Sequence, residues 1–146
     1  MLLSRACEYA LQALLHIATV PEGQYVLTRE IAQKHDLSYH FLGKILQSLV
    51  KTRLLDSQKG PGGGFTLVKS ADEITLLEVI HAIEGPDFLE GCVLGLPRCG
   101  GPNPCPVHDQ WVQAKEKVHE MFANRTVAQL LDIAKQRASE PSPPHA

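Results

Sequence analysis

The sequence TREIAQKHDLSYHFLGKILQSLVK, at residues 28–51, contains two helical patterns separated by a tight turn. Thr28 is placed to cap the first helix, which is expected to end near His35. Ser38 is placed to cap the second helix, in which a set of apolar residues recurs at helical spacing: Phe41, Leu42, Ile45, Leu46 and Leu49. A short helix, a tight turn and a helix with a buried stripe are typical of a helix-turn-helix, so this stretch decides the fold.

A β-hairpin is predicted immediately after this stretch. Leu54 and Leu55 precede SQKGPGGG at residues 57–64, and FTLV follows at residues 65–68, which is the pattern of a strand, a glycine-rich turn and a returning strand. Four glycines in five positions can serve the turn alone, but they exceed what a tight hairpin requires and favour a wing that approaches another surface. No Gly-Lys-Ser/Thr follows them, which excludes a nucleotide phosphate loop.

The flanking segments predict four further helices. Residues 3–19 are amphipathic and place Cys7 on their buried stripe. Capping boxes begin helices over about 75–83 and 126–137, and a longer helix is expected over about 106–123, with a proline in its first turn. The predicted fold class is therefore mainly α with a small β-hairpin, a winged helix-turn-helix followed by a long C-terminal helix.

The domain organisation follows from these elements. We predict a winged helix-turn-helix domain at residues 1–84, a cysteine-rich loop at 85–105, a long helix and a C-terminal helix within 106–138, and a disordered tail at 139–146. The loop has no sustained hydrophobic periodicity of a helix or a strand, and it is rich in Gly, Pro and Cys. A loop of this length in a small domain is usually functional or disordered.

The charge distribution favours a polyanion-binding face on the helix-turn-helix. The whole chain carries a net charge of -2, but residues 28–70 hold seven basic against three acidic side chains, a net charge of +4. A merely solvated surface has the same composition, so the fold decides between the two interpretations. In a winged helix-turn-helix the second helix enters the major groove of double-stranded DNA. The residues expected at the DNA are Thr28, Arg29, Ser38, Tyr39, His40, Lys44, Lys59, Gly60, Pro61, Gly62 and Gly63.

Three cysteines in the loop predict a metal centre. Six residues separate Cys92 from Cys99, five separate Cys99 from Cys105, and His108 follows closely. Three thiolates suit an iron-sulfur cluster, [2Fe-2S] or [4Fe-4S], completed by a fourth group, or a zinc ion bound as Cys3His with His108. The absence of a C-x-x-C pair disfavours an ordinary zinc ribbon. Three unrelated loop cysteines are the remaining interpretation, although free cysteines normally lie in a core.

Composition and motifs exclude several classes of protein. The chain has 146 residues, no membrane-spanning stretch and no export signal pattern, so we expect a cytoplasmic protein whose four cysteines are not a disulfide framework. It contains no C-x-x-C, no nucleophile elbow and no dense acid-base constellation. The sequence therefore gives no support for an enzyme.

The opening SRACEYALQALLHIA, the wing KGPGGGF and the three loop cysteines together resemble the Rrf-type family of bacterial transcription regulators, the IscR-, NsrR- and RirA-like iron-sulfur regulators. The resemblance covers residues 1 to about 135. It implies a homodimer joined through the long C-terminal helix, a cluster on Cys92, Cys99 and Cys105, and DNA binding that changes with cluster state. In some members of the family the fourth ligand is a histidine shortly after the third cysteine, and His108 matches this pattern. In others it comes from the first helix of the partner subunit, and Glu8 matches that pattern.

The hypothesis from sequence is a DNA-binding transcription regulator whose operator affinity is set by the state of an iron-sulfur cluster. Iron-sulfur status, redox stress and nitric oxide are the candidate signals. The alternative is a winged-helix regulator with a structural zinc site and no metal-based sensing. At Gly43 the sequence departs from IscR-like members, which carry an acidic residue there in the second helix of the motif.

Overall fold

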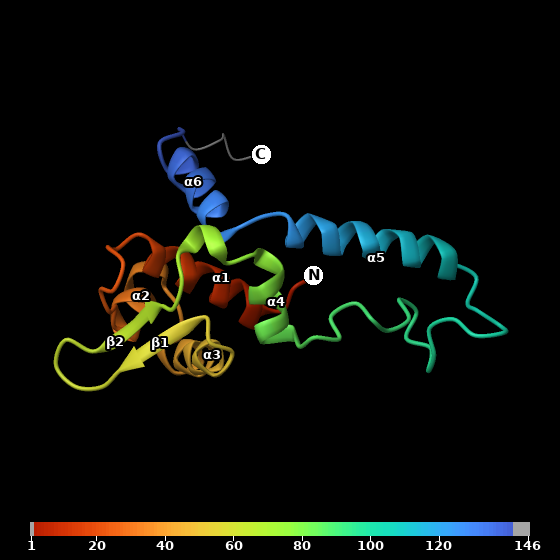
Figure 1. Cartoon of the computed structure of the whole chain (residues 1–146), viewed down its shortest axis with the longest axis horizontal. Coiled ribbons are helices and arrows are strands. Elements are labelled where there is room, and N and C mark those ends of the chain that lie inside the picture. Colours follow the sequence, from red (N-terminus) through yellow and green to blue (C-terminus); the bar gives the residue numbers. More distant parts are fainter. Residues whose placement is uncertain (1, 142–146) are drawn as a thin grey trace.

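A computed structural model describes residues 2–141, and in these residues the chain forms helices and one antiparallel hairpin (Figure 1). The elements in chain order are α1 (Arg5–Ala18), α2 (Thr28–His35), α3 (Tyr39–Lys51), β1 (Leu55–Gln58), β2 (Gly64–Leu67), the 3-10 turn η1 (Ala71–Glu73), α4 (Leu76–Glu84), α5 (His108–Ala123) and α6 (Val127–Ala138). The predicted mainly α fold with a small β-hairpin is confirmed. No helix in this part of the chain is long and apolar enough to cross a membrane.

The helix-turn-helix begins one residue earlier than the sequence indicates. Thr28 is the first residue of α2 and not its cap; the cap position is Leu27, which provides no side-chain hydrogen bond. The reason is tertiary, because Val26 pairs with Phe65 of the hairpin through two backbone hydrogen bonds of 2.8 Å and so fixes where the extended chain ends. The Ser38 cap of α3 is confirmed, since its hydroxyl accepts the amide of Phe41.

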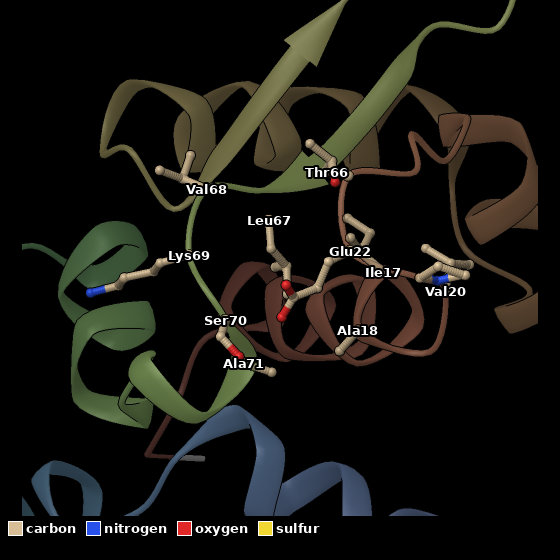
Figure 2. Close-up of a pocket in the computed structure, with 12 residues that line it drawn as sticks. Ile17, Ala18, Val20, Glu22, Thr66, Leu67, Val68, Lys69, Ser70 and Ala71 are labelled. Carbon is tan, nitrogen blue, oxygen red and sulfur yellow. The ribbon is translucent and has the colours of Figure 1, made fainter.

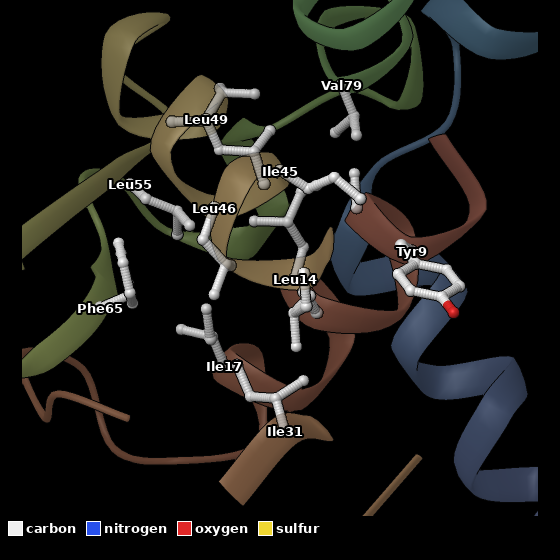
Figure 3. Close-up of a cluster of buried hydrophobic side chains, with 14 of the residues drawn as sticks. Tyr9, Leu14, Ile17, Ile31, Ile45, Leu46, Leu49, Leu55, Phe65 and Val79 are labelled. Carbon is white, nitrogen blue, oxygen red and sulfur yellow. The ribbon is translucent and has the colours of Figure 1, made fainter. Parts of the chain in front are cut away.

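The core lies between α1, α3 and α4, with the hairpin at one side (Figure 3). Leu14 of α1 and Leu46 of α3 are fully buried at its centre. The prediction that Phe41 is buried is wrong, because its side chain is 38% exposed. Phe41 lies about 100° round the helix from Leu42, and its ring instead packs edge-on against Tyr9 at a centroid distance of 5.1 Å.

The hairpin depends on two glycines that lie close to other backbone. In the register, Leu55 pairs with Leu67 and Gln58 pairs with Gly64. A Cβ at Gly63 would overlap the carbonyl of Gln58, and one at Gly64 would overlap the carbonyl of Val26. The hairpin is thus fixed both to itself and to the segment that enters α2.

The two C-terminal helices have different surroundings. α6 packs against α1 and η1, and backbone hydrogen bonds join the starts of α4 and α6, from Leu76 N–H to Arg125 O and from Val127 N–H to Ile74 O, both 2.9 Å. α5 contains no buried residue and extends from the domain alongside the cysteine loop (Figure 1). Residues 142–146 of the predicted tail lie outside the described residues.

The start of α5 also differs from its prediction. The sequence predicts Pro106 in the first turn of the helix, but α5 begins at His108 and Pro106 lies in the turn before it. That turn is closed by a 3.1 Å hydrogen bond from the His108 amide to the Cys105 carbonyl. Proline suits the second position of such a turn, because its fixed φ matches the geometry required there.

Two histidines between α1 and α2 make the stability of the fold pH-dependent. His16 Nδ1 lies 3.1 Å from His35 Nε2, and burial lowers the pKa of both side chains below the ordinary 6.5. Below pH 6.5 the unfolded chain therefore binds more protons than the folded chain. The stability that the two neutral histidines provide is complete above pH 6.5 and is lost as the pH falls through their folded pKa.

We expect the melting temperature to fall on acidification, and we expect His35→Gln to flatten this dependence in thermal denaturation. An unchanged slope in this variant would contradict the assignment.

Candidate metal centre and nucleic-acid interface

The loop between α4 and α5 brings the three predicted cysteines and His108 together as two pairs. Cys92 Sγ lies 3.8 Å from Cys105 Sγ, and Cys99 Sγ lies 3.6 Å from His108 Nδ1. Cys99 also contributes to the raised pKa of the Cys105 thiol, after desolvation and the contact with Cys92. All four cysteines of the chain are free thiols.

These two distances fit ligands that share a metal atom. Bonds of about 2.3 Å to sulfur and about 2.05 Å to nitrogen place two ligands of one tetrahedral metal about 3.8 Å apart for two sulfurs and about 3.6 Å apart for sulfur and nitrogen. Within residues 2–141, however, no group of three or more His, Cys, Asp or Glu side chains could hold one ion. What the structure brings together are two pairs of side chains, Cys92 with Cys105 and Cys99 with His108.

The loop affects the thiols of Cys92 and Cys105 in opposite directions. The amides of Leu94 and Leu96 donate to Cys92 Sγ and lower the pKa of this thiol. Desolvation raises the pKa of the Cys105 thiol, and its contact with Cys92 adds to the rise. Gly100, with φ +88°, leaves room for the His108 ring, which would lie 3.3 Å from a Cβ at this position. This glycine lets the imidazole approach the residue next to Cys99.

Cys7 and Glu8 are separate from this site in the chain. Cys7 is completely buried among Ile80 and Phe88, as the helical stripe predicts, and burial raises the pKa of its thiol to about 11. Glu8 lies in the first turn of α1. The cysteine loop lies at the outer end of α5, away from α1 (Figure 1). Within this chain, His108 is thus the predicted fourth ligand that lies beside the cysteines.

The exposed side of α3 lines a groove of about 760 Å³. It contains four of the predicted DNA-contacting residues, namely Thr28, Tyr39, His40 and Lys44. It also contains Gln47, Ser48 and Lys51, which the sequence prediction omitted although they continue the exposed face at helical spacing. A cation, amide and hydroxyl groups along one helix face can donate to base edges and phosphates.

The remaining predicted DNA contacts are distributed around this groove. Lys59, Gly60, Pro61 and Gly62 are exposed at the tip of the hairpin, whereas Gly63 is buried within the turn. Ser38 lies before α3 as its cap, and Arg29 lines a separate hollow beside Asp36. In Figure 1 the hairpin and the cysteine loop lie at opposite ends of the long axis.

A third hollow, of about 430 Å³, lies between the end of α1 and the segment that joins β2 to η1 (Figure 2). Ile17 and Leu67 provide apolar lining, and the Glu22 side chain lies between them in the view. None of the predicted metal or DNA residues lines this hollow. It is therefore separate from both candidate sites.

A wing, a capped second helix with an open polar face and a groove beside that helix define a protein of the winged helix-turn-helix class. The family model described as iron-dependent transcriptional regulator, Rrf2, matches residues 3–133. The chain belongs to this family. Regulators of the family bind DNA, and the protein is a transcription regulator and not an enzyme.

Individual relatives agree with the family assignment. The chain is 34% identical over 135 residues to a putative HTH-type transcriptional regulator of Aquifex aeolicus (strain VF5), covering 91% of this chain and 93% of the relative. It is 30% identical over 132 residues to the regulator IscR of Yersinia pseudotuberculosis, covering 90% and 80%. The solved structure of CymR (YrzC), the global cysteine regulator of B. subtilis, has a similar fold, with a TM-score of 0.75, 23% identity and coverage of 90% and 96%.

Proposed function

We propose that this regulator binds operator DNA through α3 and the wing, and that an iron-sulfur cluster on Cys92, Cys99, Cys105 and His108 sets its affinity. The observation that carries the proposal is the presence of two ligand pairs at metal-sharing distances in one loop. The likeness to IscR and to an iron-dependent family supports iron over other metals.

The pairing of the ligands favours a [2Fe-2S] cluster. One iron would be held by Cys92 and Cys105, and the other by Cys99 and His108. Iron-sulfur clusters supply one-electron redox chemistry and are sensitive to iron supply, oxidants and nitric oxide, which are the candidate signals. Histidine in place of a cysteine raises the reduction potential of such a cluster. The amides of Leu94 and Leu96 would stabilise the anionic centre from the protein side.

We further propose a homodimer through α5. Val107, Ala114 and Met121 are exposed and lie seven residues apart, so they form one line along and just before the helix. A second copy packed along this line would cover apolar surface that one chain leaves open. Two α3 helices could then occupy successive major grooves of an operator, about one DNA turn apart. The loop leads directly into α5, so binding or loss of the cluster would change how the two α5 helices pack in the dimer.

The test of the cofactor is anaerobic reconstitution followed by iron and sulfide quantification. We expect two irons and two sulfides per chain, together with sulfur-to-iron absorption in the visible range. The single tryptophan, Trp111, lies three residues after His108, so its fluorescence should be quenched when the cluster is present. Zinc without iron or acid-labile sulfide would instead support the structural zinc alternative, and four irons would exclude the two-iron assignment.

The fourth ligand can be tested with two substitutions. His108→Ala is expected to change the visible spectrum and shorten the lifetime of the reconstituted cluster in air, because it removes the partner of Cys99. Glu8→Gln is expected to leave both unchanged, because Glu8 lies on α1. The reverse result would assign the ligand to Glu8 of a second subunit.

The DNA interface predicts a steep dependence on salt. Because Lys44 lines the groove beside α3, Lys44→Ala is expected to reduce the slope of log K against log salt concentration by about one for each subunit bound. Fluorescence anisotropy with an operator duplex measures this slope. Lys117→Ala serves as the control, since it removes the same charge from α5, outside the groove. Equal slopes for both variants would place the DNA elsewhere.

A further inference from the structure

The segment that leads into Cys92 is attached to one face of α5 by three contacts. The Trp111 indole donates to the Gly91 carbonyl at 2.9 Å, Lys115 lies 4.0 Å from the Glu90 carboxylate, and His119 Nε2 lies 3.1 Å from the Phe88 carbonyl. The three helical residues are four apart and therefore lie on one face. The segment and the helix run in opposite directions, so the three contacts follow one another in order along both. We call this series of contacts the ladder and each contact a rung.

The inner end of this ladder is anchored in the core. Phe88 is 7% exposed and belongs to the buried cluster with Cys7 of α1 and Ile80 of α4. The His119 ring stacks on Phe88 at a centroid distance of 6.4 Å and meets His81 of α4 edge-on at 6.3 Å. The last rung therefore lies where α1, α4 and α5 come together.

The outer end of the ladder is adjacent to the cysteine site. Gly91 directly precedes Cys92, so a bond that fixes its carbonyl also fixes the direction in which the chain reaches this cysteine. The neighbouring rung is an exposed ion pair at 4.0 Å, and pairs of this kind contribute little. Among the contacts between the segment and α5, the Trp111 hydrogen bond is thus the one nearest to Cys92 with defined geometry.

We propose that Trp111 is a positioning residue for the metal centre: its indole holds Gly91, and through it Cys92, against α5. The inference deepens the proposed function and rests on it for the identity of the bound group. Residues that orient metal ligands from outside the coordination sphere typically affect metal affinity by about 10–100-fold. Because the indole N–H is a donor only and is used for the Gly91 carbonyl, the loss of Trp111 should weaken the site without changing its coordination.

The test uses Trp111→Phe, which keeps an aromatic ring and removes the N–H donor. In the reconstituted full chain we expect the visible spectrum to keep its shape, while its bleaching by an iron chelator accelerates by about 10-fold or more. Gln113→Ala is the matched control, because residue 113 is exposed and lies about 200° round the helix from residue 111. Equal bleaching rates for the two variants would overturn the proposal.

A second measurement does not depend on the cofactor. In metal-free protein, Trp111→Phe should increase amide hydrogen exchange in residues 91–105 and leave α1, α3 and α4 unchanged. His119→Leu, which removes the inner rung, should increase exchange nearer Phe88. If the native chain binds no iron, the proposed function fails. The exchange comparison still tests whether the ladder holds the segment before Cys92 against α5. Unchanged exchange, or faster exchange with unchanged bleaching, would overturn the positioning role.

Discussion

Replacing Cys99 with serine is expected to remove the visible absorption of the reconstituted protein and to reduce its bound iron severalfold. Cys99 is the only cysteine paired with His108, at 3.6 Å, while the other two loop cysteines pair with each other. Serine retains the size of the side chain but replaces a soft thiolate with a hydroxyl that remains protonated at neutral pH. One metal atom would then keep a single protein ligand, which is insufficient to retain it.

The control for this experiment is Cys7→Ala. Cys7 is completely buried in the domain and its thiol has a pKa raised to about 11, so it remains protonated and away from the loop. This variant should lose stability through the small cavity it creates and yet bind a full complement of iron. Cys99→Ser with native iron content, or Cys7→Ala without iron, would contradict the assignment of ligands.

Replacing Gly64 with alanine is expected to destabilise the protein by about 1–3 kcal/mol and to weaken operator binding strongly. Gly64 has φ +127°, which side chains rarely adopt, and its added Cβ would overlap the Val26 carbonyl. Relief of this overlap must break the bridge between Val26 and Phe65, which joins the wing to the start of α2. Urea denaturation and operator binding measure the two effects, and both follow from the same displaced contact.

Gly62→Ala separates strain from steric overlap. Gly62 also has a positive φ, +74°, but a Cβ there meets nothing within 4 Å. The Gly62→Ala substitution should therefore lower the free energy of unfolding only by the backbone strain, about 1 kcal/mol. The contact of the wing with Val26 should remain. If Gly64→Ala unfolds at the same urea concentration as the native chain, the close approach of the wing to Val26 is not important for stability.

Much of the fold follows from local sequence signals. The helical stripes, the two capping boxes and the Ser38 cap depend on residues within one or two turns, and they are found where the sequence predicts them. Two of the errors occur where distant segments meet. Thr28 does not cap α2 because the pairing of Val26 with Phe65 sets the end of the extended chain, and Phe41 packs edge-on against Tyr9 while it remains 38% exposed. The third error is local, because a turn closed between Cys105 and His108 sets the start of α5.

The sequence by itself determined that three cysteines and a histidine share one loop, and that a helix-turn-helix precedes a glycine-rich wing. Only the tertiary structure decided which of these side chains pair, that His108 lies beside Cys99, and that the Trp111 indole donates to the carbonyl of Gly91. The physical reason is range: periodicity and capping act between residues close along the chain. The pairing of loop side chains depends on the path that the backbone takes against α5, and no short-range pattern encodes that path.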